Sequence, residues 1–235
     1  MIPSIIVPYI NRPDLLRAFL RSVNRPVRRV LVIDNSGSLD PFFAGREMLN
    51  LPVHVVQPGW NAGVAASWNA GIRGDPLAEW WLICNSDIEF GSGDLARLEA
   101  AVEPRAAILY KMLGYAAFAV TPPYLHEVGL ADENYVLGYD DDLDWDRRRE
   151  LAGLPAVEVG FTGTHVGSAS IMSDPSLRAA NAYSHPRNDE YYRRKWGGEK
   201  LGGETFTTPF NRGGSVREWD LDINRLRDQI WPRER

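Results

Sequence analysis

The sequence predicts an α/β fold with a mainly parallel central sheet and helices on both of its faces. Short apolar runs alternate with helix-like segments along the first half of the chain, and several of these runs end abruptly in polar turn residues. A continuous apolar run suits a strand that is buried on both faces of a parallel sheet. Alternation of such strands with helices indicates βαβ units, and ligands of open α/β sheets bind beyond the carboxyl ends of the strands.

The best-defined run extends from Trp80 to Cys84 and leads directly into Asn85-Ser86-Asp87. In a parallel sheet, Asp87 would stand where a cation or a phosphate-bearing ligand is held. The same three residue types are common in turns and at helix N-caps, so a purely structural turn is the alternative.

The first half of the chain reads as strands and helices in alternation. Asn11-Arg12-Pro13-Asp14 opens the first helix, where proline is tolerated in the first turn. The expected strands are 4–7 (closed by Pro8), 29–33, 53–56 and the run leading to Asp87; the expected helices are 15–23, 42–49, a segment through Ile72 closed by Gly74, and 94–102.

The second half is more polar and less regular. We expect strands at 107–112, 116–120 and 157–166, the last carrying His165. The expected helices follow Thr121-Pro122-Pro123 to near Gly129, span 142–152 up to Gly153, and span 189–195 and 220–230.

Three polar loops follow strands of the predicted sheet: Pro8 to Arg12, Asp34 to Gly37, and Asn85 to Asp87. The carboxyl ends of parallel strands meet at one edge, so these loops converge there in the manner of a nucleotide site. The G-x-G-x-x-G fingerprint of dinucleotide folds is absent, which weakens a plain NAD-binding interpretation.

Composition narrows the functional classes. The chain has 235 residues, of which 44% are hydrophobic and 24% charged, as in ordinary globular proteins. A net charge of −5 makes a nucleic-acid partner bound through a basic surface unlikely. One cysteine permits no internal disulfide and suits a reducing cytoplasm. We expect no secretion signal and no membrane span, since no apolar stretch is long enough; the oligomeric state is left open.

In chain order, the motifs resemble those of family-2 glycosyltransferases of the GT-A fold, including a rhamnosyltransferase-like subgroup. The resemblance covers roughly residues 3–200 and predicts a GT-A type, Rossmann-like nucleotide-diphospho-sugar transferase fold. The matching motifs are Ile5-Ile6-Val7-Pro8 with Asn11-Arg12-Pro13, Val32-Ile33-Asp34-Asn35-Ser36, Asn61-Ala62-Gly63, Asn69-Ala70-Gly71, Leu82 to Asp87, Asp132-Glu133, Asp141 to Asp144 with Arg148, His165 to Ser168, and Lys195 to Gly198.

The resemblance implies a domain over 1–200, with a donor half at about 1–105 and an acceptor half at about 106–200, followed by an extension at 201–235 that packs on it. It also implies an inverting, metal-assisted transfer of a sugar, of the hexosyltransferase type, from a UDP- or TDP-sugar. The acceptor would be a hydroxyl on a glycan, a lipid-linked sugar, a protein or a modified base.

On the donor side, the resemblance implies that Asp34 binds the nucleobase or ribose, with an Asx-turn as the structural alternative. Asp87 would ligate Mn²⁺ or Mg²⁺, hard cations that prefer oxygen ligands. Asn85 stands in place of the first acid of the family's D-x-D motif and brings no charge. His165 would complete the metal shell, or else be a structural strand histidine. The expected donor-binding residues are Pro8, Tyr9, Arg12, Asp34, Asn61, Gly63, Asn69, Asn85 and Ser86.

On the acceptor side, the resemblance implies that Asp142, or else the neighbouring Asp141, takes the acceptor's proton as general base. Acids in the first turn of a helix are also favoured by its macrodipole, which is the structural alternative. Trp145 is the expected acceptor-contacting aromatic. The segment 191–195 is either a lid over the diphosphate or a solvated amphipathic helix.

Three other readings compete with transfer. Because Asn85 leaves the D-x-D motif incomplete, a catalytically silent nucleotide-sugar binding module is one alternative. A sugar-phosphate nucleotidylyltransferase is the second alternative, but such an enzyme requires a Gly-rich basic loop after the first strand, which the chain lacks. A glycosidase also uses paired carboxylates but leaves the strand-end residues unexplained.

Overall fold

The parallel part of the central sheet consists of β1 (Ser4–Tyr9), β2 (Val30–Asp34), β3 (Val53–Val56) and β4 (Trp81–Cys84). The computed structural model describes residues 1–40 and 51–208. β1 pairs in parallel with β2 and β4, while β2 pairs with β3. Every residue of β2 and β4 is buried, whereas burial alternates along the edge strand β3. This burial explains the continuous apolar runs and confirms the four predicted strands.

β6 (Leu109–Leu113), β7 (Ala117–Val120) and β8 (Ala156–Glu158) extend the sheet beyond β4. Within the described residues the strand order is β3-β2-β1-β4-β7-β6-β8. β7 runs antiparallel to both β4 and β6, and β8 is parallel to β6. The sheet is therefore mainly parallel, as predicted, and the two predicted halves of the chain meet inside it at the β4–β7 pair.

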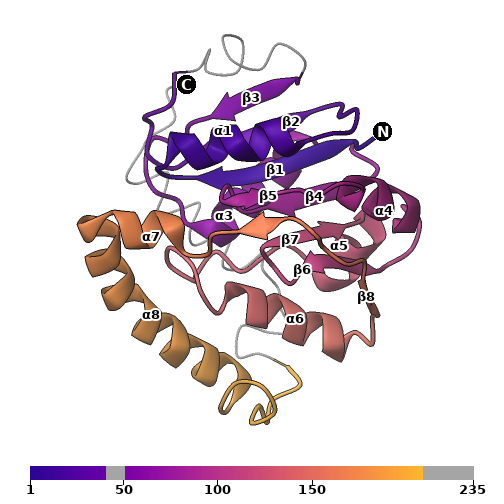
Figure 1. The fold of residues 1–235 in the computed structure, drawn as a ribbon. Helices are drawn as coiled ribbons and strands as arrows, with labels where there is room; N and C mark the ends of the chain where they lie inside the picture. The colour runs from indigo at the N-terminus through magenta and orange to yellow at the C-terminus, as the bar shows by residue number, and fades with distance from the viewer. Residues whose placement is uncertain (41–50, 209–235) are drawn as a thin grey trace, which may run out of the picture.

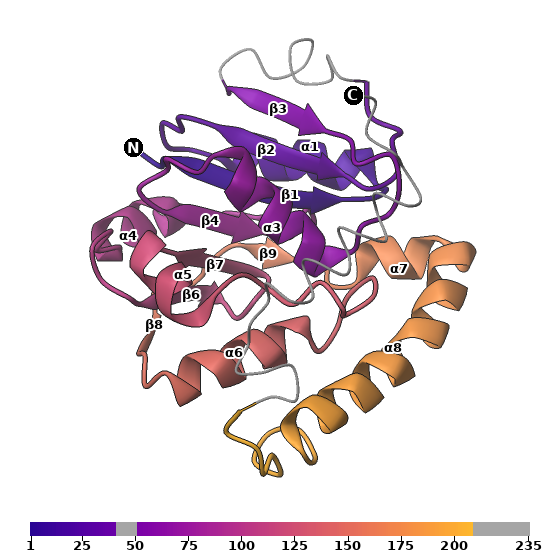
Figure 2. The ribbon, with the colours of Figure 1, turned by 180° about the vertical axis from the view of Figure 1, so that it is seen from behind.

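Helices cover both faces of the sheet, which confirms that prediction. α1 (Pro13–Ser22) and α4 (Asp94–Ala101) pack on one face, which faces the viewer in Figure 1. α3 (Val64–Gly74), α5 (Pro122–Val128) and α6 (Asp141–Leu151) pack on the opposite face, seen in Figure 2.

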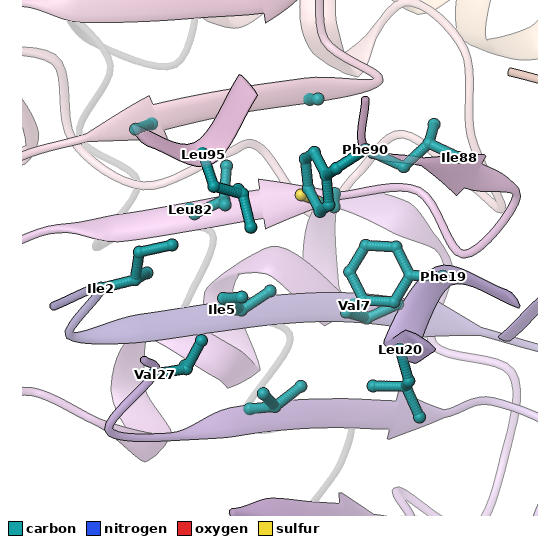
Figure 3. Packing of buried hydrophobic residues seen from close by; sticks show 14 of the residues in the cluster. Ile2, Ile5, Val7, Phe19, Leu20, Val27, Leu82, Ile88, Phe90 and Leu95 are labelled. Atoms are coloured by element: carbon teal, nitrogen blue, oxygen red, sulfur yellow. The ribbon is translucent and has the colours of Figure 1, made fainter. Parts of the chain in front are cut away.

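Two apolar clusters, one on each face, hold these layers together. In the cluster of Figure 3, Ile5 and Val7 of β1 meet Phe19 and Leu20 of α1. All four side chains are buried, and full burial of such a side chain stabilises a fold by about 1.5–3 kcal/mol. Opposite, α3 lies so close to β1 that a Cβ on Gly71 would fall 2.3 Å from a methyl of Ile6. Glycine is therefore required at that contact.

The predicted strand 157–166 is in fact two strands in different sheets. β8 joins the central sheet, whereas β9 (Thr164–His165) pairs antiparallel with β5 (Ile88–Glu89). Gly160, with φ of 86°, and Gly163 lie between them. A Cβ on Gly163 would lie 1.9 Å from the Glu89 carbonyl oxygen, so this crossing needs glycine. His165 nevertheless lies on a strand, as predicted.

The predicted helix 189–195 is only the end of a much longer one. α7 (Ala169–Ser173) leads into α8 (Pro175–Trp196), which has 22 residues and runs diagonally across Figure 1. Asp174 caps α8 by accepting hydrogen bonds from two backbone amides, and Pro175 occupies its first turn. Both are sequence signals for a helix start. The middle of α8 contains Asn, Ser, His and Pro186, which are poor helix formers, and these residues hide the helix in the sequence.

No helix within residues 1–40 and 51–208 is both long and apolar enough to cross a membrane. The predicted helices 42–49 and 220–230 lie outside the described residues, as does most of the predicted extension at 201–235.

Candidate functional site

A cavity of about 340 Å³ lies at the edge of the sheet where β1, β2 and β4 end. Parallel strands bring their carboxyl ends together, so the turns after them form one wall of this cavity. The opposite wall comes from the loop before α6, from the first turn of α6, and from α7 and α8. Nine of the residues predicted from sequence line it: Pro8, Tyr9, Asn61, Gly63, Asn85, Ser86, Asp87, Asp141 and Asp142.

Asp87 and His165 face each other beside the turn after β4. The His165 Nε2 atom lies 3.3 Å from Asp87 Oδ1, and the other carboxylate oxygen accepts a longer hydrogen bond, 3.4 Å, from the Ala169 amide. Asn85 lines the same wall, and its backbone N–H donates to the Ala116 carbonyl at 2.8 Å. A carboxylate, an imidazole and an amide oxygen are all available to a cation here.

The metal expectation can be tested against this donor set. Among residues 1–40 and 51–208, no three His, Cys, Asp or Glu side chains gather in a way that could hold a metal ion. Asp87 and His165, even with Asn85 nearby, therefore do not form a metal site made of protein ligands alone. They do fit Mg²⁺ or Mn²⁺ bound jointly with a phosphate ligand, because such ions keep several waters and commonly use only one or two carboxylates.

The loop after β2 has a different arrangement from the one expected. The Asp34 carboxylate accepts hydrogen bonds from three backbone amides, at Ser36, Gly37 and Leu39, and from the side chains of Ser36 and Gln57. Burial alone would raise the pKa of Asp34, but these hydrogen bonds outweigh it and lower the pKa. Asp34 is fully buried and does not line the cavity, so its geometry is that of the Asx-turn alternative. Its role with a nucleoside stays a prediction.

Asn35, which the sequence analysis missed, takes the place beside the cavity. Its side chain accepts a hydrogen bond from the Ala62 amide and donates one to Ser67 Oγ, both at 2.9 Å. It thereby ties the end of β2 to the start of α3. Its position directly after Asp34, at the strand end, was the available signal.

Gly63 lets the loop before α3 meet the loop before α6. Its φ is 82°, and a Cβ there would lie 3.0 Å from the Leu137 nitrogen. The Val64 amide donates to the Leu137 carbonyl at 2.7 Å, which joins the two loops. Asn69, in contrast, is buried away from the cavity and forms hydrogen bonds with the backbone of Ala131 and with Glu133.

Asp141 and Asp142 both line the cavity at the start of α6 but differ in exposure. Asp141 is 2% exposed, and its Oδ2 atom has no hydrogen-bond partner among the described residues. Burial, reinforced by the charge of Asp142, raises the pKa of Asp141 to about 8. Burial also raises the pKa of Asp142, which is only partly buried. Asp142 is the more exposed of the two carboxyls, so burial opposes its negative charge less than it opposes that of Asp141, and Asp142 is the better placed to act as a base.

The expectation that Trp145 contacts an acceptor is not met. Trp145 has no exposed surface and packs among the rings of Trp68, Phe118 and Tyr124, with centroids 5.6–6.0 Å apart. Its position four residues into the helix turns it toward the sheet. Tyr139, which is 39% exposed and lines the cavity, is the aromatic that the sequence analysis missed.

The segment 191–195 is helical and two-sided: Arg193 and Arg194 are exposed, as in the amphipathic-helix alternative, while its other face is buried. Lys195 is 1% exposed and lies between Asp132 and Asp144, with Nζ 2.7 Å and 2.6 Å from their carboxylate oxygens. Tyr191 also donates to Asp132. One face of this end of α8 is therefore buried in the folded interior, and the cavity is lined instead by the first half of α8, at Leu177 and Asn181, and by α7.

Two more predicted residues lie outside the cavity lining. Arg12 has φ of 64° at the start of α1, and its guanidinium pairs with Asp14 at 2.7 Å. His165 flanks Asp87 from β9 without lining the cavity itself. Donor binding by Arg12 and metal binding by His165 stay predictions.

A mainly parallel α/β sheet with a cavity beyond its strand ends is the arrangement of the GT-A fold. The chain belongs to glycosyl transferase family 2: the model of that family matches residues 4–126, which contain β1 to β4 and the turn with Asp87. No curated protein matches the chain.

Three solved structures share the fold. A mannosyltransferase from Pyrobaculum calidifontis, PcManGT, solved with GDP-Man and Mn²⁺, is 15% identical with a TM-score of 0.57 over 78% of this chain and 62% of that one. S. aureus TarS 1-349 with UDP is 15% identical, with a TM-score of 0.56 over 98% and 78%. GalNAc-T7 with UDP, GalNAc and Mn²⁺ is 12% identical, with a TM-score of 0.58 over 95% and 55%. This chain thus spans less than two thirds of the mannosyltransferase, and these likenesses concern the fold.

Proposed function

We propose that the protein transfers a sugar from a nucleotide-diphosphate sugar to a hydroxyl acceptor with inversion at the anomeric carbon. One observation carries the proposal: a single cavity is lined on one side by the turn 85–87 and on the other by Asp141 and Asp142. Inversion needs this arrangement, because the acceptor attacks from the face opposite the departing diphosphate. Membership of glycosyl transferase family 2 supports the same reaction class.

The donor side of the cavity is the wall made by the strand ends. Asn61, Asn85 and Ser86 offer amide and hydroxyl groups to the sugar and the phosphates, and Pro8 and Tyr9 offer apolar surface. Asp87, with His165 beside it, would hold Mn²⁺ or Mg²⁺. When bound, such a cation supplies positive charge that stabilises the leaving diphosphate. The Mn²⁺ in two of the structures that share the fold supports this assignment.

The acceptor side is the start of α6. Asp142, the more exposed of the two acids, accepts the proton of the acceptor hydroxyl as the hydroxyl oxygen bonds to the anomeric carbon and the bond to the diphosphate breaks. Asp141 keeps its proton and so adds no second charge beside the base. Pairs of carboxyls whose environments separate their pKa values commonly divide acid and base roles in this way.

The donor is a UDP- or TDP-hexose in this proposal, and the acceptor is a glycan, a lipid-linked sugar, a protein or a modified base. UDP is the nucleotide in two of the structures that share the fold, and GDP-Man is the donor in a third. GDP-sugars therefore belong in any screen.

The test is a thermal-shift screen of UDP-, TDP- and GDP-sugars with and without Mn²⁺, followed by a transfer assay with the stabilising donor. A ligand that binds only the native state raises the melting temperature. A donor that stabilises the protein and then releases its nucleotide in the presence of acceptor supports the proposal. Stabilisation without any hydrolysis or transfer would instead identify a binding module, the alternative raised by Asn85.

A further inference from the structure

The loop that leads into the acid pair, residues 136–140, has an unusual backbone. Leu137, Tyr139 and Asp140 have φ values of 65°, 73° and 68°, in the left-handed region that side-chain-bearing residues disfavour. Leu137, Gly138 and Tyr139 line the cavity, and Asp141 is the first residue after the loop. Such a conformation persists only where the surroundings impose it, and it is often found beside functional sites.

One side chain of α8 supplies most of that constraint. Asn188 is 1% exposed, and its Nδ2 donates to the carbonyls of Val136, Gly138 and Tyr139 at 3.0, 2.9 and 3.2 Å. Its Oδ1 accepts from the Val136 amide at 3.0 Å. The amide group of Asn188 therefore binds three of the five residues of the loop and uses both its donor and its acceptor.

Neighbouring contacts act on the same loop. His185, one turn before Asn188 on α8, packs against Tyr139 with ring centroids 4.9 Å apart. Lys200 pairs with Asp140 at 2.6 Å. On its other side the loop contacts Gly63 and Val64, at the start of α3. The loop is thus held between α8 and the donor wall of the cavity.

We propose that Asn188 is a positioning residue for the transfer reaction, which holds the 136–140 loop and through it fixes Tyr139 and the pair Asp141–Asp142 against the cavity. The inference rests on the proposed function for its catalytic part only. Asn188 does not line the cavity, so it acts through the backbone of the loop and touches neither substrate. Through Asn188, the polar helix α8 supports the cavity wall, a role that the sequence did not predict.

The decisive variant is Asn188→Asp, which changes one atom and preserves shape. The new carboxylate has no hydrogens to donate and would face three carbonyl oxygens, so the loop should be released. Asn188→Ala removes the contacts without adding charge and serves as the second variant if Asn188→Asp does not fold. Ser184→Ala is the matched control: Ser184 is equally buried one turn earlier on α8, but among the described residues its hydroxyl donates only to the Asn181 carbonyl, within the helix.

The first readout is independent of catalysis. Hydrogen exchange of the Val136 amide and of the peptide covering 136–140 should accelerate in both Asn188 variants and not in Ser184→Ala, while exchange in β1 and β4 stays as in the wild type. Unchanged exchange at 136–140 overturns the proposal. If the wild type transfers no sugar at all, the proposed function fails, and this measurement alone decides whether Asn188 holds the loop.

The second readout separates positioning from folding. Calorimetric donor titration gives the fraction of competent protein, and kcat is expressed per competent site. We expect kcat to fall about 10- to 100-fold in the Asn188 variants, as for a misplacement of about 1 Å, while the donor Kd changes less than about twofold. If hydrogen exchange at 136–140 accelerates but kcat per competent site stays at the wild-type value, the positioning role is overturned.

Discussion

At the scale of single residues, the site depends on two adjacent carboxyls in different surroundings. Asp141 is enclosed and carries an unpaired oxygen, whereas Asp142 reaches the cavity and is partly exposed. Enclosure disfavours charge, and two like charges at adjacent positions disfavour it further. Two neighbouring residues therefore differ in how strongly burial opposes their charge, and Asp142 is the better placed of the two to act as a base.

Replacement of the proposed base should abolish its chemistry and leave binding intact. Asp142→Asn keeps the size and polarity of the side chain but removes its ability to accept a proton, so we expect kcat to fall by about 10²- to 10⁴-fold. Donor affinity, measured by calorimetry with Mn²⁺, should be nearly unchanged, because the donor wall is on the strand ends. Glu150→Gln, on the exposed end of the same helix, is the control and should behave as the wild type. Retained turnover in Asp142→Asn would exclude it as the base.

Replacement of Asp141 should change stability in a way that depends on pH. Its folded pKa, about 8, lies above the ordinary 3.8, so the native state holds a proton that the unfolded state releases between these values. The free energy of unfolding contributed by this group therefore falls as pH rises from about 4 to about 8. Asp141→Asn removes that loss and should stabilise the protein at pH 7, by at most about 4 kcal/mol at about 1.36 kcal/mol per pKa unit.

Denaturant unfolding of wild type and Asp141→Asn at pH 5, 6, 7 and 8 measures this effect. The stability difference should grow steadily in favour of the variant toward higher pH. A difference that is constant across this range would show that Asp141 is already ionised in the native protein.

At the scale of elements, α8 joins parts of the chain that are far apart in sequence. Asn188 contacts the loop before α6, and Lys195 contacts Asp132 and Asp144. The sequence could not show this helix in full, because helix prediction relies on an apolar stripe and α8 has buried polar residues in its place. Buried polar pairs are specified by geometry between elements, which no local pattern records.

Lys195 carries much of the stability of that contact. It neutralises two buried carboxylates; burial would raise the pKa of Asp132, yet Lys195 outweighs it and lowers the pKa. Lys195→Met fills similar space, but within the described part of the chain it leaves Asp144 paired with Arg148 and Asp132 without a cation. We expect a loss of about 3–5 kcal/mol at pH 7, the usual cost of breaking a buried pair from one side.

The same variant has a pH signature. The pKa of Asp132 is lowered in the wild type, so the stability that its pairing contributes is present above its ordinary pKa of about 3.8 and is lost as the pH falls below that value. The deficit of Lys195→Met relative to wild type should therefore shrink toward acid pH, which urea unfolding at pH 7 and at about pH 3 measures. Arg187→Met, which changes an arginine stacked over Tyr183 on the exposed side of α8, is the control and should lose about 1 kcal/mol or less. Equal losses for the two variants would contradict a special role for Lys195.

At the scale of the whole molecule, the cavity lies between the strand ends and the start of α6. The positions of these two parts could be predicted from the sequence to different degrees. The strand ends were predictable, since apolar runs closed by Asn85 to Asp87 or by Asp34 to Gly37 are local signals. The acid pair was found through motif order, but its placement opposite Asp87 depends on the β4–β7 pairing and on α8. The prediction that Trp145 contacts an acceptor was wrong because it also depended on how elements pack: α6 packs on the sheet through the Trp145 ring, which is buried.

The strands on the two sides of the β4–β7 pair belong to one sheet, so we expect the described domain to unfold in a single transition. A ligand bound in the cavity should shift that transition to higher temperature. At a donor concentration of about 100 times Kd, binding contributes about 2.7 kcal/mol, which raises Tm by about 5–10 °C for a chain of this size. Asp87→Ala removes the carboxylate that faces His165, so the Mn²⁺-dependent part of this shift should disappear. Glu89→Ala, two residues further on an exposed side chain of β5, should keep it. An equal Mn²⁺-dependent shift in Asp87→Ala and wild type would place the cation elsewhere, and the turn after β4 would then hold the donor by hydrogen bonds alone.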